Sequence, residues 1–273
     1  MFSNLLGEYI AMNAFKFLIA IFSITLTAAC AFDGKIHRSE ADADPFENIN
    51  RPIFTFNQHA DKYVLRPLSE GYRAITTPFV RERINNTLST IKEPVSAVNH
   101  LLQGEPKGAA INISRFVINA TLGLAGMFDV ANGWGLKADE ASMNETLAKW
   151  CIVDGPYLVL PLLGPSTPRA ATGLAVDSVL NPVYLSTYSD ANIRDKINYP
   201  YTAIRAVALR EKASVLLDDL ERNSVDLYAA TRSAYLQNQS KLRCFNSTEV
   251  ETEAYDFDFG IEEEEAAFEE SGY

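Results

Sequence analysis

Apolar residues recur every three or four positions along most of the chain, while sustained alternation of apolar and polar residues is scarce. That period is typical of α-helices that bury one face. A polar residue followed directly by proline marks a helix start, because proline fits the first turn, where its missing N–H is not needed. Four such pairs open helical stretches, at Asp44-Pro45, Thr77-Pro78, Glu105-Pro106 and Thr167-Pro168. The pattern predicts an all-α protein.

Two of these helices have features of their own. The longest is predicted to run from about Tyr201 to Leu236, with leucines and tyrosines along one face. The first contains Pro52, which cannot donate a backbone hydrogen bond and is therefore expected to kink or restart the helix.

Two apolar stretches do not fit an ordinary helical domain. Residues 119–129 are nearly uncharged and contain Gly123 and Gly126, a spacing that by itself indicates close helix packing. Residues 155–165 contain three prolines, which exclude a regular helix or a central strand. Segments this apolar are either covered by protein or face lipid, and the residues alone leave both open. Neither reaches the about 20 apolar residues of a spanning helix, so any lipid contact would be shallow or in-plane.

An apolar run at residues 17–26 ends in small residues before Cys30. It matches the apolar region and cleavage site of a secretory signal peptide. We therefore interpret residues 1–29 as a signal peptide, with Met12 as the possible true start, because the segment before it contains no Lys or Arg. The alternative is an uncleaved anchor with an incidental cysteine.

The junction before Cys30 resembles a bacterial lipobox, in which the cysteine thiol takes a diacylglycerol and becomes the mature N-terminus. Two or more acyl chains anchor a protein stably to a membrane. Ala31 rather than Asp follows the cysteine, which by the same resemblance favours the outer membrane. Residues 30–44 are then a lipidated tether, and lipid anchoring favours membrane contact by the apolar stretches.

The net charge of −11 belongs to one end of the chain. All 24 Lys and Arg lie within residues 1–243, whereas eleven of the 35 Asp and Glu follow Arg243, so the first 243 residues are formally neutral. A neutral body argues against nucleic-acid binding, which needs clustered Lys and Arg. Residues 245–273 are predicted to be a disordered acidic tail that serves solvation or docks a basic partner. Residues 45–244 are the predicted helical domain.

Residue patterns of catalytic and metal sites are missing. His37, His59 and His100 are isolated in the sequence, and no Gly-x-Ser-x-Gly elbow or phosphate-binding glycine loop occurs. Cys151 and Cys244 either form a disulfide in an oxidising compartment or stay free. We expect no catalysis, no cofactor and no metal.

Several motifs in chain order resemble the MlaA (VacJ) family of outer-membrane lipoproteins. They are Asp44–Asn57, Arg66-Pro67, Glu93-Pro94, Asn99, Leu102–Gly104, Arg115-Phe116, Asn119–Ala131, Thr146-Leu147, Trp150 and Gly155–Pro161. Together they cover about residues 44–236. The sequence departs from the family pattern around Met143-Asn144 and around Ala148–Cys151, where Cys151 stands at a usual glycine position. Ala170 also replaces an acid beside Arg169, so that the ion pair expected there is absent.

This resemblance implies a single compact, ring-like, multi-helix domain lying in-plane in the inner leaflet of the outer membrane and facing the periplasm. It implies removal of mislocalised phospholipids from the outer leaflet through an amphipathic channel to a soluble periplasmic carrier, without covalent chemistry and often on a trimeric porin. The alternative is a porin-associated structural lipoprotein that transports no lipid.

The resemblance and the apolar stretches together nominate site residues. Cys30 is the lipidation site. The candidates for the lipid channel or membrane contact are Phe54, Phe56, Asn57, Leu122, Leu124, Met127, Phe128, Leu158, Leu160 and Leu162.

Overall fold

Helices form most of the protein in the computed structural model, which describes residues 44–187, 190–242 and 244. The elements, in chain order, are α2 (Glu47–Ala60), the π-helix η1 (Asp61–Leu65), α3 (Arg66–Ile75), α4 (Pro78–Leu102), α5 (Pro106–Thr121), α6 (Val130–Gly133), α7 (Met143–Lys149), β1 (Leu158–Leu160), β2 (Gly164–Ser166), α8 (Pro168–Leu180), α9 (Pro182–Thr187), α10 (Ala191–Lys212), α11 (Ser214–Asn223) and α12 (Leu227–Ser240). The predicted helical class is confirmed. The predicted signal peptide, Cys30 with most of its predicted tether, and the predicted acidic tail lie outside the described residues.

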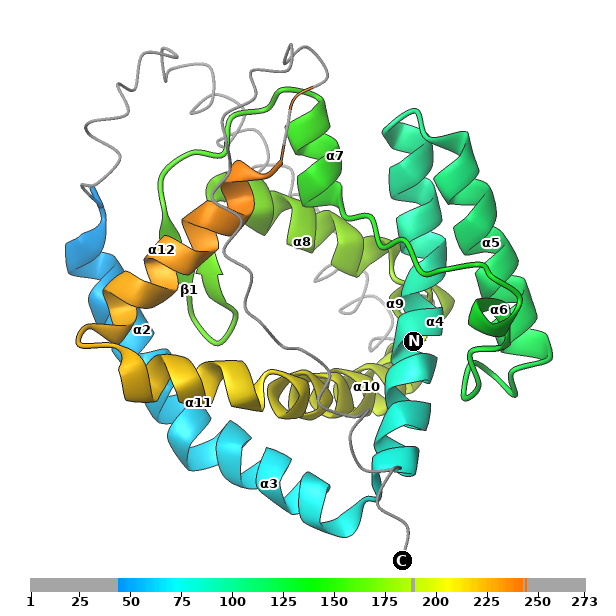
Figure 1. Cartoon of the computed structure of the whole chain (residues 1–273), viewed down its shortest axis with the longest axis horizontal. Helices are drawn as coiled ribbons and strands as arrows, with labels where there is room; N and C mark the ends of the chain where they lie inside the picture. Colours follow the sequence, from blue (N-terminus) through cyan, green and yellow to red (C-terminus); the bar gives the residue numbers. More distant parts are fainter. Residues whose placement is uncertain (1–43, 188–189, 243, 245–273) are drawn as a thin grey trace, which may run out of the picture.

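The helices are arranged as a ring (Figure 1). α2, η1 and α3 follow one another along one side, and α4 closes the opposite side. Contacts of α3 with α10, of α9 with α4 and α8, and of α12 with β2 complete the circuit. α5 and α6 lie outside the ring, where α5 packs along α4. The ring-like arrangement implied by the family resemblance is therefore present.

The predicted helix starts hold for three of the four Pro-marked stretches. The Thr77 hydroxyl accepts from the Val80 amide at 3.3 Å, and the Thr167 hydroxyl accepts from the Ala170 amide at 3.2 Å, so each threonine caps the helix that its proline opens. α5 likewise begins at Pro106. The first helix begins later than expected, at Glu47, because the Asp44 carboxylate binds the Phe46 amide at 3.0 Å in the turn before the helix.

One prediction about helix continuity is wrong, and of the two outcomes expected at Pro52 the restart does not occur. The stretch from Tyr201 to Leu236 is three helices, because the chain turns at Ala213 and again before Asp226, whose side chain caps α12. Conversely, α2 passes through Pro52 without ending. Pro52 and the residue four positions before it are exposed, so water can pair with the carbonyl that proline leaves free.

Apart from residues 119–121, which end α5, the two unusual apolar stretches are not helical. Residues 122–127 form tight turns, in which Leu124, Ala125 and Gly126 all have positive φ angles. A Cβ on Gly126 would lie 2.6 Å from the Thr90 hydroxyl, so the glycine allows close contact with α4. Residues 158–166 form a small antiparallel hairpin, with β1 and β2 paired from Leu158 opposite Ser166 to Leu160 opposite Gly164. The exclusion of a regular helix is confirmed there, but a short strand pair was not expected.

The distribution of polarity is unusual for a globular domain. Within the described residues, buried polar side chains outnumber buried apolar ones, and half of the buried apolar residues are alanines. The largest fully buried side chains are all asparagines and threonines, whereas large apolar residues are exposed on nearly every helix. Polar groups hold the interior together, and apolar groups cover much of the outside.

None of the helices in the described part of the chain has both the length and the apolar character needed to cross a bilayer.

Candidate functional site

The hairpin is held against α2 by two asparagines seven residues apart on one helix face. The first is Asn50, which is 1% exposed. Its Nδ2 donates to the Tyr157 carbonyl at 3.0 Å, and its Oδ1 accepts from the Val159 amide at 2.9 Å. The side-chain amide thus pairs with the open edge of β1 as a neighbouring strand would.

Asn57 repeats this arrangement two turns along α2. Its Nδ2 donates to the Leu160 carbonyl at 2.9 Å, and its Oδ1 accepts from the Leu162 amide at 2.7 Å. Asn57 was predicted as a channel or membrane-contact residue, and here it positions the hairpin tip. Sequence reasoning missed its partner Asn50, although the seven-residue spacing within the first motif was a usable signal.

Phe54 was predicted to contact lipid, and its main contact is internal. It is half-buried against Tyr157, Val159 and Tyr228. Its ring centroid lies 5.5 Å from that of Tyr228 in an edge-on arrangement. Burial raises the pKa of Tyr157 to about 12, so this cluster stays neutral.

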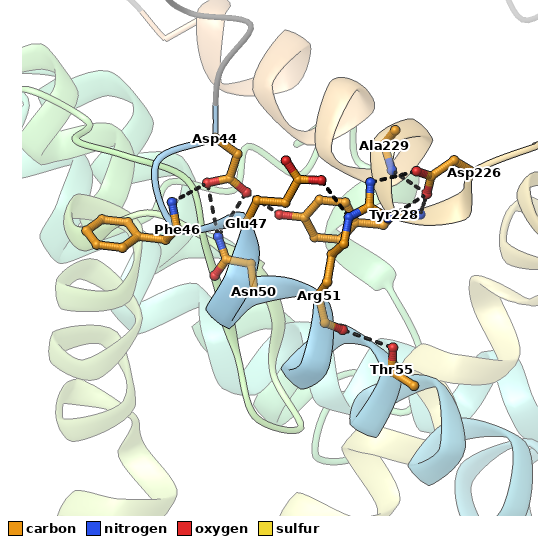
Figure 2. A network of polar contacts seen from close by, with 9 residues as sticks. All are labelled: Asp44, Phe46, Glu47, Asn50, Arg51, Thr55, Asp226, Tyr228 and Ala229. Atoms are coloured by element: carbon orange, nitrogen blue, oxygen red, sulfur yellow. Dashed lines mark hydrogen bonds and ion pairs between the residues drawn. The ribbon is translucent and has the colours of Figure 1, made fainter.

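The polar network in Figure 2 joins the start of the described chain to α2 and α12. The Asp44 carboxylate accepts from Asn50 Nδ2 at 3.1 Å and from the Tyr228 hydroxyl. Beside it, Arg51 bridges Glu47 at 2.6 Å and Asp226 at 2.7 Å. The predicted tether therefore enters the domain where α2 and α12 meet.

The apolar side chains at the end of β1 become more exposed toward the hairpin tip. Leu158 and Leu160 are half-buried, whereas Leu162 is 67% and Leu163 is 66% exposed. Phe56, on α2, is also exposed. The structure therefore brings Phe54, Phe56, Asn57 and the three predicted hairpin leucines to one region of the ring, formed by α2 and β1.

The remaining candidates lie elsewhere, in the turns after α5. Leu122, Leu124 and Met127 are exposed there. Phe128 is half-buried, with its ring centroid 6.5 Å from that of Phe79 on α4. The exposed members of the predicted set are thus divided between two surfaces. We call them the hairpin surface (Phe56 and Leu162, with the neighbouring Leu163, which was not predicted) and the turn surface (Leu122, Leu124, Met127).

Buried charges support the turn surface from within. Arg115 of α5 donates to Glu93 at 2.7 Å, to Asp129 at 3.1 Å and to the Leu136 carbonyl at 2.6 Å. Burial raises the pKa of Glu93, and the hydrogen bond from Arg115 opposes that rise. Asn119 also binds Asp129, at 2.9 Å. The sequence motifs contain these residues but did not reveal that they form one cluster.

Two of the departures from the family pattern acquire a structural account. Cys151 has a φ of +63°, the left-handed region in which glycine is usual, and it forms a disulfide with Cys244. The open question of their pairing is thereby answered. Ala170 cannot pair with Arg169, and Arg169 instead forms an ion pair at 3.2 Å with Asp154 on the preceding loop, which was not expected.

The histidines in the described part have ordinary roles. His100 is buried and contacts Glu105 at 2.9 Å and the Asp139 carbonyl at 3.1 Å. His59 is exposed beside Thr55. No group of three or more His, Cys, Asp or Glu within residues 44–187, 190–242 and 244 is placed to hold a metal ion.

Known proteins resemble this chain over most of its length. An uncharacterised protein of Rickettsia conorii is 37% identical over 196 residues, covering 70% of this chain and 74% of the relative. A Haemophilus influenzae protein named intermembrane phospholipid transport system lipoprotein MlaA is 30% identical over 231 residues, covering 83% of this chain and 90% of the relative.

A solved structure agrees with the fold. It comes from work on the structural basis for maintenance of bacterial outer membrane lipid asymmetry, and it matches with a TM-score of 0.57 at 32% identity, covering 73% of this chain and 98% of the other. The MlaA lipoprotein family model matches residues 42–242, which is more than half of the chain. These matches extend over the whole ring described above, so this chain belongs to the MlaA lipoprotein family.

Proposed function

We propose that this protein is an outer-membrane lipoprotein that takes mislocalised phospholipids from the outer leaflet and passes them to a soluble periplasmic carrier. Membership of a family whose relatives are named as phospholipid-transport lipoproteins supports this proposal. The lipid passes through unchanged, because the work is transfer between environments and not bond cleavage.

The observation that carries the proposal is the polarity of the domain. Many large apolar side chains are exposed, and most of the buried side chains are polar. In water, exposed apolar surface would favour aggregation. In a bilayer leaflet the same surface is removed from water, which stabilises the inserted protein by about 25 cal/mol per Å² of apolar area. A lipid path across that layer would also need polar groups along it, because a bare headgroup in hydrocarbon is costly.

Each group of candidate residues then has a part. The lipidated Cys30 would anchor the chain, with the tether entering the domain at Asp44. The turn surface and the exposed hairpin leucines would contact acyl chains, and Asn57 would hold the hairpin tip in place. A domain of this kind lies in one leaflet without crossing it.

Reconstitution tests the proposal directly. The lipidated protein is placed in vesicles with fluorescent phospholipid, and a soluble periplasmic lipid carrier is added as acceptor. Intact labelled lipid on the acceptor supports transport. Absence of transfer together with normal binding to a trimeric porin supports the structural alternative, and released fatty acid indicates hydrolysis; either result contradicts the proposal.

A further inference from the structure

A cavity of about 260 Å³, lined by both polar and apolar residues, lies between α4, α8 and α10, next to the start of α7. Its ionisable and amide lining residues are Lys92, Glu140, Glu145, Asp177, Asn181 and Arg205. The cavity is separate from the hairpin surface and from the turn surface, because it shares no residue with either. It is smaller than the about 300–1,000 Å³ of sites that enclose a drug-sized molecule. A compact polar group fits such a volume better than acyl chains do.

Arg205 is the unusual member of this lining. Its Nε is buried without a hydrogen-bond partner, and the guanidinium forms no ion pair with any residue that the structure describes. Arg205 is half-buried, and arginines that are more deeply buried are paired, as Arg115 is with Glu93 and Arg210 is with Asp61. An unpaired buried donor costs about 1–3 kcal/mol, and more for a charged group. The buried Nε of Arg205 therefore has room for an acceptor that is not part of the ring.

Nearby carboxylates do not satisfy Arg205 because they are engaged elsewhere. Asp177 accepts from Asn99 Nδ2 and from the Met143 amide, both at 3.0 Å. Glu140 pairs with Lys92 at 3.3 Å. Glu145 Oε2 accepts from the Ser142 amide at 2.9 Å. Arg205 thus acts on Asp177 only through the attraction of its charge, and it is hydrogen-bonded to none of these three acids.

We propose that this cavity binds the zwitterionic headgroup of a phospholipid, with Arg205 donating to the phosphodiester oxygens. Guanidinium groups suit phosphate because two parallel N–H donors match two oxygens. The lining has three acids and two bases, so it disfavours an additional net negative charge and accommodates an ammonium beside the phosphate. This inference rests on the proposed function and adds a headgroup class to it.

Binding of soluble headgroups tests the inference on the full chain in detergent. We expect calorimetry to show binding of glycerophosphoethanolamine that weakens at least about tenfold in Arg205→Gln, because a charge-assisted bond is lost. The matched control is Arg194→Gln, on the same helix, whose arginine lies outside the cavity and faces Asp195 at 3.5 Å. This control is expected to bind as the wild type does.

Two further ligands identify the source of the phosphate. Glycerophosphoglycerol, which lacks the amine, is expected to bind more weakly than glycerophosphoethanolamine, and inorganic phosphate more weakly still. Absence of glycerophosphoethanolamine binding by the wild type, equal binding by Arg205→Gln, or preference for either of the other ligands overturns the inference.

A second variant guards against misfolding. Arg205→Lys keeps the charge but loses the planar fork, so it is expected to bind with intermediate affinity while its circular dichroism spectrum matches that of the wild type. Binding by this variant at wild-type strength contradicts the role assigned to the fork.

The lipid-transfer assay separates this inference from the proposed function. Full transfer by Arg205→Gln overturns the headgroup site and leaves transport standing. Absence of transfer by the wild type overturns transport itself, whatever the calorimetry shows.

Discussion

At the scale of single residues, hydrogen bonds of asparagine side chains hold segments together where most domains use packed aliphatic side chains. Asn50 and Asn57 complete the open edge of β1, Asn119 binds Asp129, and Asn99 binds Asp177. Three of the four are fully buried. Replacing one of them would leave its backbone or carboxylate partners buried without a hydrogen bond to protein or water. This dependence makes the domain sensitive to substitutions that would be mild on a surface.

Asn50→Ala is predicted to destabilise the domain by about 1–3 kcal/mol, because it leaves the Tyr157 carbonyl and the Val159 amide unpaired in a buried site. Chemical denaturation in detergent measures the free energy of unfolding. The matched control is Asn238→Ala, at an exposed position of α12, which is expected to change stability by less than about 0.5 kcal/mol. Equal effects of the two substitutions would contradict the role of Asn50.

Glu105 makes the free energy of unfolding depend on pH in the acidic range. The hydrogen bond from Lys149 lowers the pKa of Glu105 below its usual 4.5 despite some desolvation, and His100 adds to the effect. The ionised form is therefore favoured by folding, and its contribution is present above pH 4.5 and is lost as the pH falls through the folded-state pKa.

We therefore predict that Glu105→Gln loses less stability than the wild type when the pH falls from 6 to about 3.5. Unfolding free energies at both pH values give the difference. Glu70→Gln, at an exposed acid on α3, serves as control and should follow the wild type. Parallel pH profiles for wild type and Glu105→Gln would refute the assignment.

At the scale of elements, connections between distant segments close the ring. The disulfide joins Cys151, in the turn after α7, to Cys244, which lies shortly after the end of α12. The two cysteines are 93 residues apart in the sequence. Asp44 and Arg51 link α2 to α12, and Arg210 links α10 to η1 at 2.6 Å. The C-terminal helix is thus attached at both of its ends.

Breaking the disulfide is predicted to cost up to about 4–5 kcal/mol, since a loop of this length restricts the unfolded chain strongly. Cys151→Ser, Cys244→Ser and the double variant are expected to unfold at the same temperature, below that of the oxidised wild type. Adding reductant should lower only the wild-type midpoint. Additive losses in the double variant would show that the cysteines act separately.

The turn surface is predicted to bind membrane. Replacing Leu122 and Leu124 by Glu removes about 1.5–3 kcal/mol of transfer free energy for each leucine that enters the bilayer. Vesicle flotation of the unlipidated Cys30→Ser protein measures this partitioning without the anchor. Leu122→Phe, which keeps an apolar side chain, is the matched control and should float as before. Unchanged flotation of the Glu variant would exclude this surface from membrane contact.

At the scale of the whole molecule, the ring is one part of a longer chain. Residues 1–43 and the acidic residues from 245 onward lie outside the described structure, and their roles as signal, anchor and tail remain predictions from the sequence. The near-neutral charge of the first 243 residues is compatible with a domain placed in a leaflet, because charges in hydrocarbon are costly.

Cys30→Ser is predicted to leave the precursor without a lipid and to abolish transport in cells, because one weakly inserted domain does not replace several acyl chains. Mass spectrometry of the membrane fraction detects the missing lipid, and sensitivity to detergents reports the loss of outer-membrane asymmetry. Full activity of the unlipidated protein would contradict the anchor model.

Local features were readable from the sequence because their causes are local. Helical periodicity and the threonine caps at Thr77 and Thr167 depend on residues within one turn. The sequence did not predict that α2 continues through Pro52, because this depends on the solvent access of the helix there. It also did not predict that the helix from Tyr201 is divided, because this depends in part on the cap that Asp226 provides for α12.

By itself, the sequence determined the helical class, the charge asymmetry and the family, since periodicity, composition and motif order are all written along the chain. Only the tertiary structure decided that Asn57 meets Leu160, that Cys151 meets Cys244 and that Arg169 finds Asp154. It also separated the candidate residues into two surfaces and left Arg205 unpaired in a cavity. The physical reason is that these pairings depend on which helix faces meet when the ring closes, and no local pattern encodes that.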